Sequence, residues 1–156
     1  VCAFLPTRLA SRRRVVHVDL HTARGPRGDY VAFLEQGDGT AKARAAPIFG
    51  ARLRAWDPGS EDGYEMRGGM LPELQRRTPG PRYDALTLEF GTTTDVALLR
   101  ALRAENQLHF HGQRTPDHPA LRAMRAGYYP TDPRWQAAVV AHAPAVHRCA
   151  AALLAS

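Results

Sequence analysis

The sequence predicts an α/β protein in which short strands alternate with helices. Two segments, residues 15–21 and 83–90, carry apolar side chains at alternate positions, which is the period of a half-buried strand. Other segments carry apolar residues every three or four positions, which is the period of a helix. With 156 residues, 44% hydrophobic and 23% charged, the chain has the composition of one globular domain.

The first half of the chain is expected to hold two strands and two short helices. The strand at residues 15–21 has one apolar and one polar face. The apolar face holds Val16, Val18 and Leu20, and the polar face holds His17, Asp19 and His21. Gly and Pro predict a loop at residues 22–28, before a second strand at 30–34. Residues 39–53 have helical spacing that Pro47 should interrupt. A glycine-rich loop at 57–69 precedes an amphipathic stretch at 71–77.

The second half begins with a turn at residues 78–81 and the strand at 83–90, whose apolar face holds Leu86, Leu88 and Phe90. Thr93 or Thr94 can cap the next helix, which should stop at Gly112. Its expected core stripe is Val96, Leu99, Leu102, Asn106 and Phe110. A short helix follows at 121–126, and a last helix over 135–153 should bend at Pro144 without ending there. No internal repeat or long linker divides the chain.

Charge and composition exclude several functional classes. The net charge is +6, and 20 of the 21 basic residues are Arg, but only residues 12–14 form a tight run. Nucleic-acid binding is therefore not expected. No run approaches the ~18 apolar residues of a membrane span, so we expect no membrane partner. A cytoplasmic location is expected, and export is the open alternative, since a signal segment would lie upstream of Val1. Cys2 and Cys149 lack the spacing of a metal or redox motif and are expected to be buried thiols.

Polar side chains stand near the ends of both predicted strands, where α/β folds gather their functional groups. His21 ends the first strand and Glu89 lies near the end of the second. A neutral imidazole can bind Zn²⁺, and a carboxylate can take a proton from a metal-bound water. From spacing alone, a structural polar pair is the alternative interpretation.

Four segments in order resemble the zinc carboxypeptidase superfamily: HVDLHTARGPRGDY (17–30), LTLEFGT (86–92), ALRAENQLHFHG (101–112) and YYPTDPRWQ (128–136). Within it they are most similar to a bacterial branch long described only as a domain of unknown function, with a motif similar to DLHTGLGPYGD. The resemblance implies a three-layer α/β/α zinc-peptidase fold, of the phosphorylase/hydrolase-like type, with a mixed sheet.

The resemblance also implies a reaction, the hydrolysis of a peptide or amide bond next to a terminal carboxylate. In that superfamily one zinc ion is held by a His and a Glu of an early H-x-x-E motif and by a later His. By resemblance His21 is the later His, and Glu89 is the catalytic base and then acid. The substrate would be a peptide or an acylated amino acid.

One half of the zinc site is missing from this sequence. None of the seven His residues is followed three positions later by Glu, so one of the three expected protein ligands is present. We therefore expect residues 1–156 to be the carboxyl-terminal portion of a catalytic domain that is incomplete at its N-terminus. The upstream half of the same protein is the expected partner, and the isolated chain is expected to be inactive.

Five other residues are candidates for the site. Tyr64 resembles the mobile tyrosine that closes over substrate in carboxypeptidases, or it is an ordinary loop residue. Asp19 and His17 share the polar face with His21 and could orient its imidazole; alternatively, Asp19 pairs with an Arg and His17 is a core residue. Arg24 and Arg27 could attract a substrate carboxylate or be solvated loop charges.

Two other functions remain open. Relatives that remove acyl groups, aspartoacylase and succinylglutamate desuccinylase, use a similar D-L-H ligand motif, so deacylation is one alternative. A noncatalytic remnant that acts as a binding domain without metal is the other. Substitution of Glu89 would separate an enzyme from a binding domain.

Overall fold

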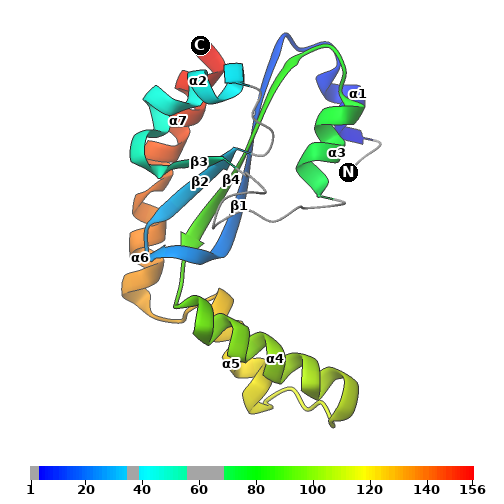
Figure 1. The fold of residues 1–156 in the computed structure, drawn as a ribbon, viewed down its shortest axis with the longest axis vertical. Helices are drawn as coiled ribbons and strands as arrows, with labels where there is room; N and C mark the ends of the chain where they lie inside the picture. The colour runs from blue at the N-terminus through cyan, green and yellow to red at the C-terminus, as the bar shows by residue number, and fades with distance from the viewer. Residues whose placement is uncertain (1–3, 35–38, 56–68) are drawn as a thin grey trace. The chain divides into compact units, whose positions relative to one another are not determined.

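A computed structural model describes residues 4–34, 39–55 and 69–156 (Figure 1). Its elements, in order, are α1 (Phe4–Leu9), β1 (Arg14–Arg27), β2 (Tyr30–Leu34), α2 (Gly39–Phe49), a 3-10 turn (Gly50–Arg52), β3 (Leu53–Ala55), α3 (Met70–Arg77), β4 (Arg82–Gly91), α4 (Asp95–His111), α5 (Pro119–Tyr128), α6 (Pro133–Ala141) and α7 (Ala143–Ala155). The predicted fold class, α/β with a mixed sheet, is confirmed.

The four strands form one sheet in the order β1-β4-β2-β3. The backbone N–H groups of Arg82 and Thr92 donate to the carbonyls of Arg13 and Ala23, with the same sequence offset in both bonds. Strands β1 and β4 are therefore parallel. Strand β3 pairs with β2 in parallel.

Strand β2 runs against β4. Gly91, the last residue of β4, accepts a hydrogen bond from the N–H of Gly28 and donates its own N–H to the carbonyl of Asp29. Because residues 28 and 29 immediately precede β2, this strand begins where β4 ends. Strand β1, at one end of the strand order, is an edge of the sheet in the described part of the chain.

The chain divides into two compact units, and β1, β2 and β4 each run from one into the other. The first unit comprises Val1–Leu20, Ala32–Leu88 and Pro144–Ser156, and the second His21–Val31 and Glu89–Ala143. In the first unit, Leu71 and Leu74 of α3 pack with Tyr83 and Ala85 of β4. This small core has Leu5, Leu9 and Val15 around it.

The first unit also contains a buried charge. The carboxylate of Asp84, with 1% of its side chain exposed, pairs with Arg44 at 2.5 Å and with Arg82 at 3.1 Å. Arg82 and Arg14 donate further hydrogen bonds to the last carbonyls of α7, at Leu153 for Arg82 and at residues 154 and 155 for Arg14. These cations satisfy carbonyls that the helix end leaves without partners.

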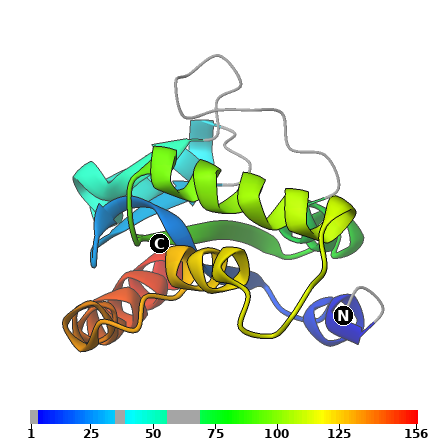
Figure 2. The same ribbon diagram turned by 90° about the horizontal axis from the view of Figure 1, so that it is seen from below.

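In the second unit, α4 and α5 lie side by side (Figures 1 and 2). The hydroxyl of Thr94 accepts a hydrogen bond from the N–H of Ala97 and caps α4, as predicted. The buried residues of α4 are Leu98, Ala101 and Leu108. The expected core stripe of this helix was therefore wrong: Val96, Leu99, Leu102 and Phe110 are 59%, 58%, 38% and 66% exposed.

Other boundaries differ from the sequence prediction. The segment at residues 22–28, expected to be a loop, is the continuation of β1 to Arg27. Helix α2 includes Pro47 and ends at Phe49, so the proline does not interrupt it. The last helix is two helices, α6 and α7, that meet at His142, because Pro144 lies in the first turn of α7, where its missing N–H costs nothing. Leu20, expected on an apolar face, is 64% exposed.

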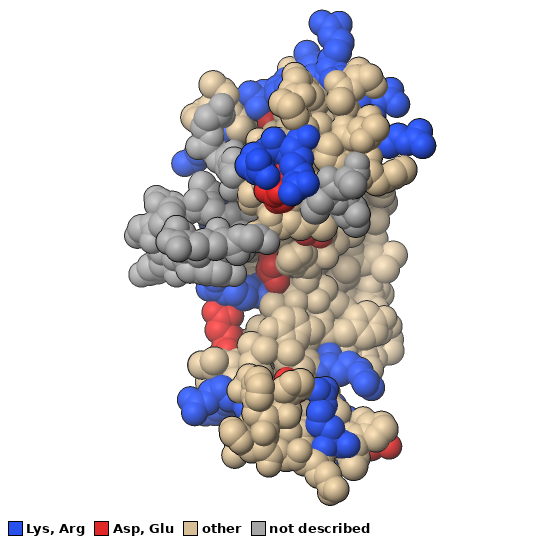
Figure 3. Space-filling model, turned by 90° about the vertical axis from the view of Figure 1, so that its right-hand side faces the viewer, with Lys and Arg blue, Asp and Glu red and all other residues tan. Residues whose placement is uncertain are grey.

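Figure 3 shows basic side chains scattered in separate groups over the visible face, without one continuous stripe. One stretch of the described chain, Pro119–Ala155, contains an 18-residue window apolar enough to cross a membrane by length and composition. This stretch spans α5, α6 and α7. A single stretch of this kind is weak evidence, and the cytoplasmic location stays a prediction.

Candidate functional site

The structure brings His21 and Glu89 together. The Nδ1 atom of His21 lies 3.8 Å from Oε2 of Glu89. Since β1 and β4 are parallel neighbours, residues near 21 stand beside residues near 90, and the two side chains meet across adjacent strands. His21 is within β1 rather than at its end, because the strand continues to Arg27. Both residues belong to the second compact unit.

The two side chains differ in exposure. The side chain of His21 is 52% exposed and that of Glu89 is 14% exposed. The backbone N–H of Arg24 points to Oε1 of Glu89 at 3.4 Å. The pair therefore combines an imidazole that a ligand can reach with a shielded carboxylate, an arrangement that can hold a cation or pass a proton.

Two glycines allow the chain to pass close to Glu89. Gly25 has a φ of +110°, a conformation that favours glycine, and a Cβ there would lie 3.5 Å from the carbonyl oxygen of Glu89. At Gly91 a Cβ would meet the carbonyl oxygens of Gly25 and Pro26 at 2.2 and 2.3 Å. Any side chain at position 91 would push apart the end of β4 and the segment after His21.

Thr92 and Trp135 hold the end of β4 close to the segment that follows His21. Thr92 is fully buried, and its hydroxyl lies 2.6 Å from the carbonyl of Gly127 and 3.0 Å from that of Ala23. The indole N–H of Trp135 donates to the carbonyl of Gly91 at 2.8 Å. Sequence reasoning did not single out either residue, although Thr92 ends LTLEFGT and Trp135 stands in YYPTDPRWQ.

The two candidate substrate-binding arginines already have partners inside the second unit. The guanidinium of Arg24 lies 3.4 Å from Asp95. Arg27 donates to the carbonyl of Thr92 and pairs with Asp132 at 3.1 Å. The backbone N–H of Arg134, together with Arg27, lowers the pKa of Asp132 below its usual value. A substrate carboxylate would have to replace Asp95 or Asp132.

His17 and Asp19 belong to the first compact unit. The Nδ1 atom of His17 lies 2.8 Å from the hydroxyl of Tyr83. Burial lowers the pKa of His17, and the charge of Asp19 partly opposes this shift. Burial also raises the pKa of the Tyr83 phenol. Whether these residues orient His21 stays a prediction, and Tyr64 lies outside the described residues.

A complete zinc centre is not formed by the described residues. Within them no group of three His, Cys, Asp or Glu side chains is placed to hold a metal ion. His21 fits the role of a single ligand, since its imidazole is half exposed and lies beside a carboxylate. Three-ligand zinc sites require two further donors.

Comparisons with known proteins give one match. No curated protein and no solved structure matches the chain. Residues 2–142 match the model of a family described as protein of unknown function (DUF2817). The match covers most of the 156 residues, and the chain belongs to this DUF2817 family.

Proposed function

We propose that the protein is a zinc-dependent hydrolase of peptide or amide bonds, related to the zinc carboxypeptidases, and that this chain supplies one zinc ligand and the catalytic carboxylate. The observation that carries the proposal is the 3.8 Å approach of His21 to Glu89 on neighbouring parallel strands. It joins two residues 68 positions apart to which the resemblance assigns a shared site. Membership of a family of unknown function is compatible with this proposal.

The chemistry assigned to this chain is proton transfer by Glu89. A carboxylate shielded from solvent to 14% exposure, beside an imidazole, can accept a proton from a water and return it to a leaving nitrogen. The N–H of Arg24 helps to orient Oε1 for this task. A zinc ion bound by His21 and two further ligands would supply Lewis-acid activation of the water and the carbonyl.

The position of β1 in the sheet supports a source for the two remaining ligands. Strand β1, which carries His21, is an edge of the described sheet. Leu20, the residue next to His21, is 64% exposed. A further segment that paired with this edge would lie next to His21, and an H-x-x-E motif there would bring the two remaining ligands.

Substitution in the complete protein tests the proposal. Glu89→Gln should retain zinc and lower the turnover of a panel of acylated amino acids and dipeptides by several orders of magnitude. His21→Ala should lower the zinc content. Glu73→Gln, which changes a partly exposed carboxylate on α3, is the matched control and should change neither. Full activity in Glu89→Gln, or normal zinc content in His21→Ala, would refute the proposal, and a noncatalytic binding domain would show no hydrolysis in any variant.

A further inference from the structure

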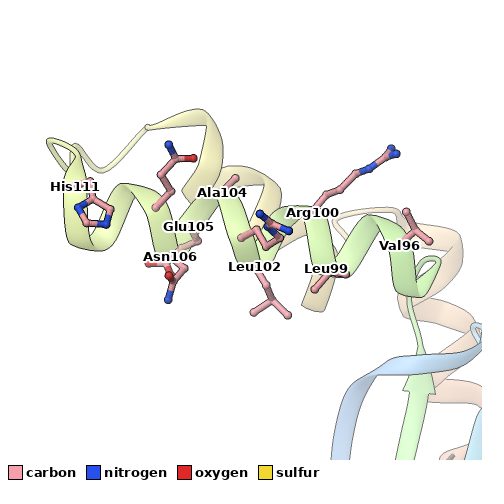
Figure 4. A pocket seen from close by; sticks show the side chains of 10 residues that line it. Val96, Leu99, Arg100, Leu102, Ala104, Glu105, Asn106 and His111 are labelled. Carbon is pink, nitrogen blue, oxygen red and sulfur yellow. The ribbon is translucent and has the colours of Figure 1, made fainter.

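Helix α4 carries an apolar stripe on the side that α5 does not cover. Val96, Leu99, Leu102 and Phe110 are 59%, 58%, 38% and 66% exposed, whereas the residues buried on this helix are Leu98, Ala101 and Leu108. Leu99, Leu102 and Asn106 project from the same side of α4 (Figure 4). Along the helix the stripe runs about 20 Å, or four turns. Exposed apolar surface of this kind marks interaction sites.

The stripe has a positive border. Val96, Leu99 and Leu102 share an open surface of α4 with Arg100, Arg103 and Asn106. Neither Arg100 nor Arg103 forms an ion pair with another described residue. The acids of this helix are already engaged, Asp95 with Arg24 and Glu105 with Arg114 at 3.2 Å. The border of the stripe therefore has two cations available for an acidic partner.

We propose that this face of α4 is a docking surface for an acidic amphipathic helix of a partner protein. Leu or similar side chains spaced three and four residues apart would fill the stripe, and Glu or Asp beside them would pair with Arg100 and Arg103. Asn106, inside the stripe, can pair with one polar group and so fix the register.

The features of the surface favour a protein helix over other occupants. A lipid surface suits a continuous apolar ridge, whereas the polar Asn106 interrupts this stripe. A second copy of the chain would bring Arg100 and Arg103 close to the same two cations, which disfavours self-association. The surface does not include His21 or Glu89, so the inference is independent of the proposed function.

Two designed peptides test the charge and the apolar parts of the surface separately. One 21-residue helix has Leu at heptad positions a and d and Glu at e and g, and the other has Lys in place of Glu. Fluorescence anisotropy should show the complete protein binding the Glu peptide at least tenfold more tightly than the Lys peptide. Equal affinity for both peptides, or no binding of the Glu peptide, would overturn the proposal.

Variants locate the contact on α4. Arg100→Glu/Arg103→Glu and Leu99→Asn/Leu102→Asn should each weaken binding of the Glu peptide at least tenfold. Arg125→Glu/Arg134→Glu makes the same charge change at two exposed positions on α5 and α6 and should alter affinity less than threefold. Far-UV circular dichroism confirms that each variant is folded. An equal loss in the control pair would refute a localised surface.

Two further measurements distinguish the other occupants. The complete protein should stay monomeric in sedimentation at the concentrations used, and it should not bind phosphatidylglycerol vesicles. A dimer that Leu99→Asn/Leu102→Asn dissolves would assign the face to a second copy. Vesicle binding that the same variant removes would assign it to a membrane. Either result overturns the proposal.

Discussion

Replacement of Thr92 by Val should destabilise the protein, because the Thr92 hydroxyl holds the end of β4 close to β1 and α5. Thr92 is 0% exposed, and its hydroxyl lies 2.6 Å from the carbonyl of Gly127 at the end of α5 and 3.0 Å from that of Ala23 in β1. Val keeps the shape of Thr but lacks the donor. The carbonyl of Gly127, in the last turn of its helix, then loses this hydrogen bond in a dry environment.

The expected cost follows from the loss of a buried hydrogen bond. A buried polar group left without its partner costs about 1–3 kcal/mol. For a chain of this size, about 2 kcal/mol corresponds to a fall in Tm of roughly 4–8 °C. The backbone N–H of Thr92 still donates to Ala23 in the variant, so the pairing of β1 with β4 is weakened and not lost.

Thermal unfolding followed by circular dichroism measures the effect, with Thr93→Val as the matched control. Thr93 is the exposed neighbour, and its loss should change the free energy of unfolding by less than about 0.5 kcal/mol. Equal Tm values for wild type and Thr92→Val would refute the role assigned to the hydroxyl. A Thr93→Val variant as unstable as Thr92→Val would show that the effect is not specific to the buried position.

Two further changes test the first compact unit. Burial lowers the pKa of His17 from 6.5, so the unfolded chain binds a proton at this residue more readily than the folded protein does. The free energy of unfolding is therefore highest above pH 6.5 and decreases as the pH falls below that value. Wild type should therefore lose more Tm than His17→Gln between about pH 7.5 and 5.5, and parallel losses would contradict this. Asp84→Ala should cost about 3–5 kcal/mol in urea unfolding, since it leaves Arg44 and Arg82 without their buried partner. A cost below about 1 kcal/mol would show that the cations relax into solvent.

The sequence predicted the strands that carry the site more accurately than the segments that connect them. The alternating pattern at residues 83–90 matches β4 to within one residue at each end. The segment after His21 was expected to be a loop because of its Gly and Pro residues, yet it continues β1. Local composition favours a turn there, but the hydrogen bond from Thr92 to Ala23 holds it in the sheet.

The candidate site was predicted in part. Spacing alone could not show that His21 and Glu89 lie close together. Their distance depends on the order and register of the strands, and the local sequence does not determine either. Sequence reasoning missed three residues because their partners are distant in the sequence. Asp132 pairs with Arg27, Trp135 donates to the carbonyl of Gly91, and Thr92 donates to the carbonyl of Gly127. Their position inside the resembling segments was the available signal.

The misplaced stripe of α4 shows what helical periodicity can and cannot establish. The spacing of Val96, Leu99, Leu102 and Phe110 correctly identifies one apolar face, and the helix forms where predicted. Periodicity reports the chemistry of a face, however, and not what covers it. In the described structure α5 packs against α4, where a Cβ on Gly127 would lie 3.2 Å from Leu98, and the residues buried on α4 are Leu98, Ala101 and Leu108. Within the described residues the second apolar face of α4 stays exposed, and it is the face that we propose binds an acidic helix of a partner protein.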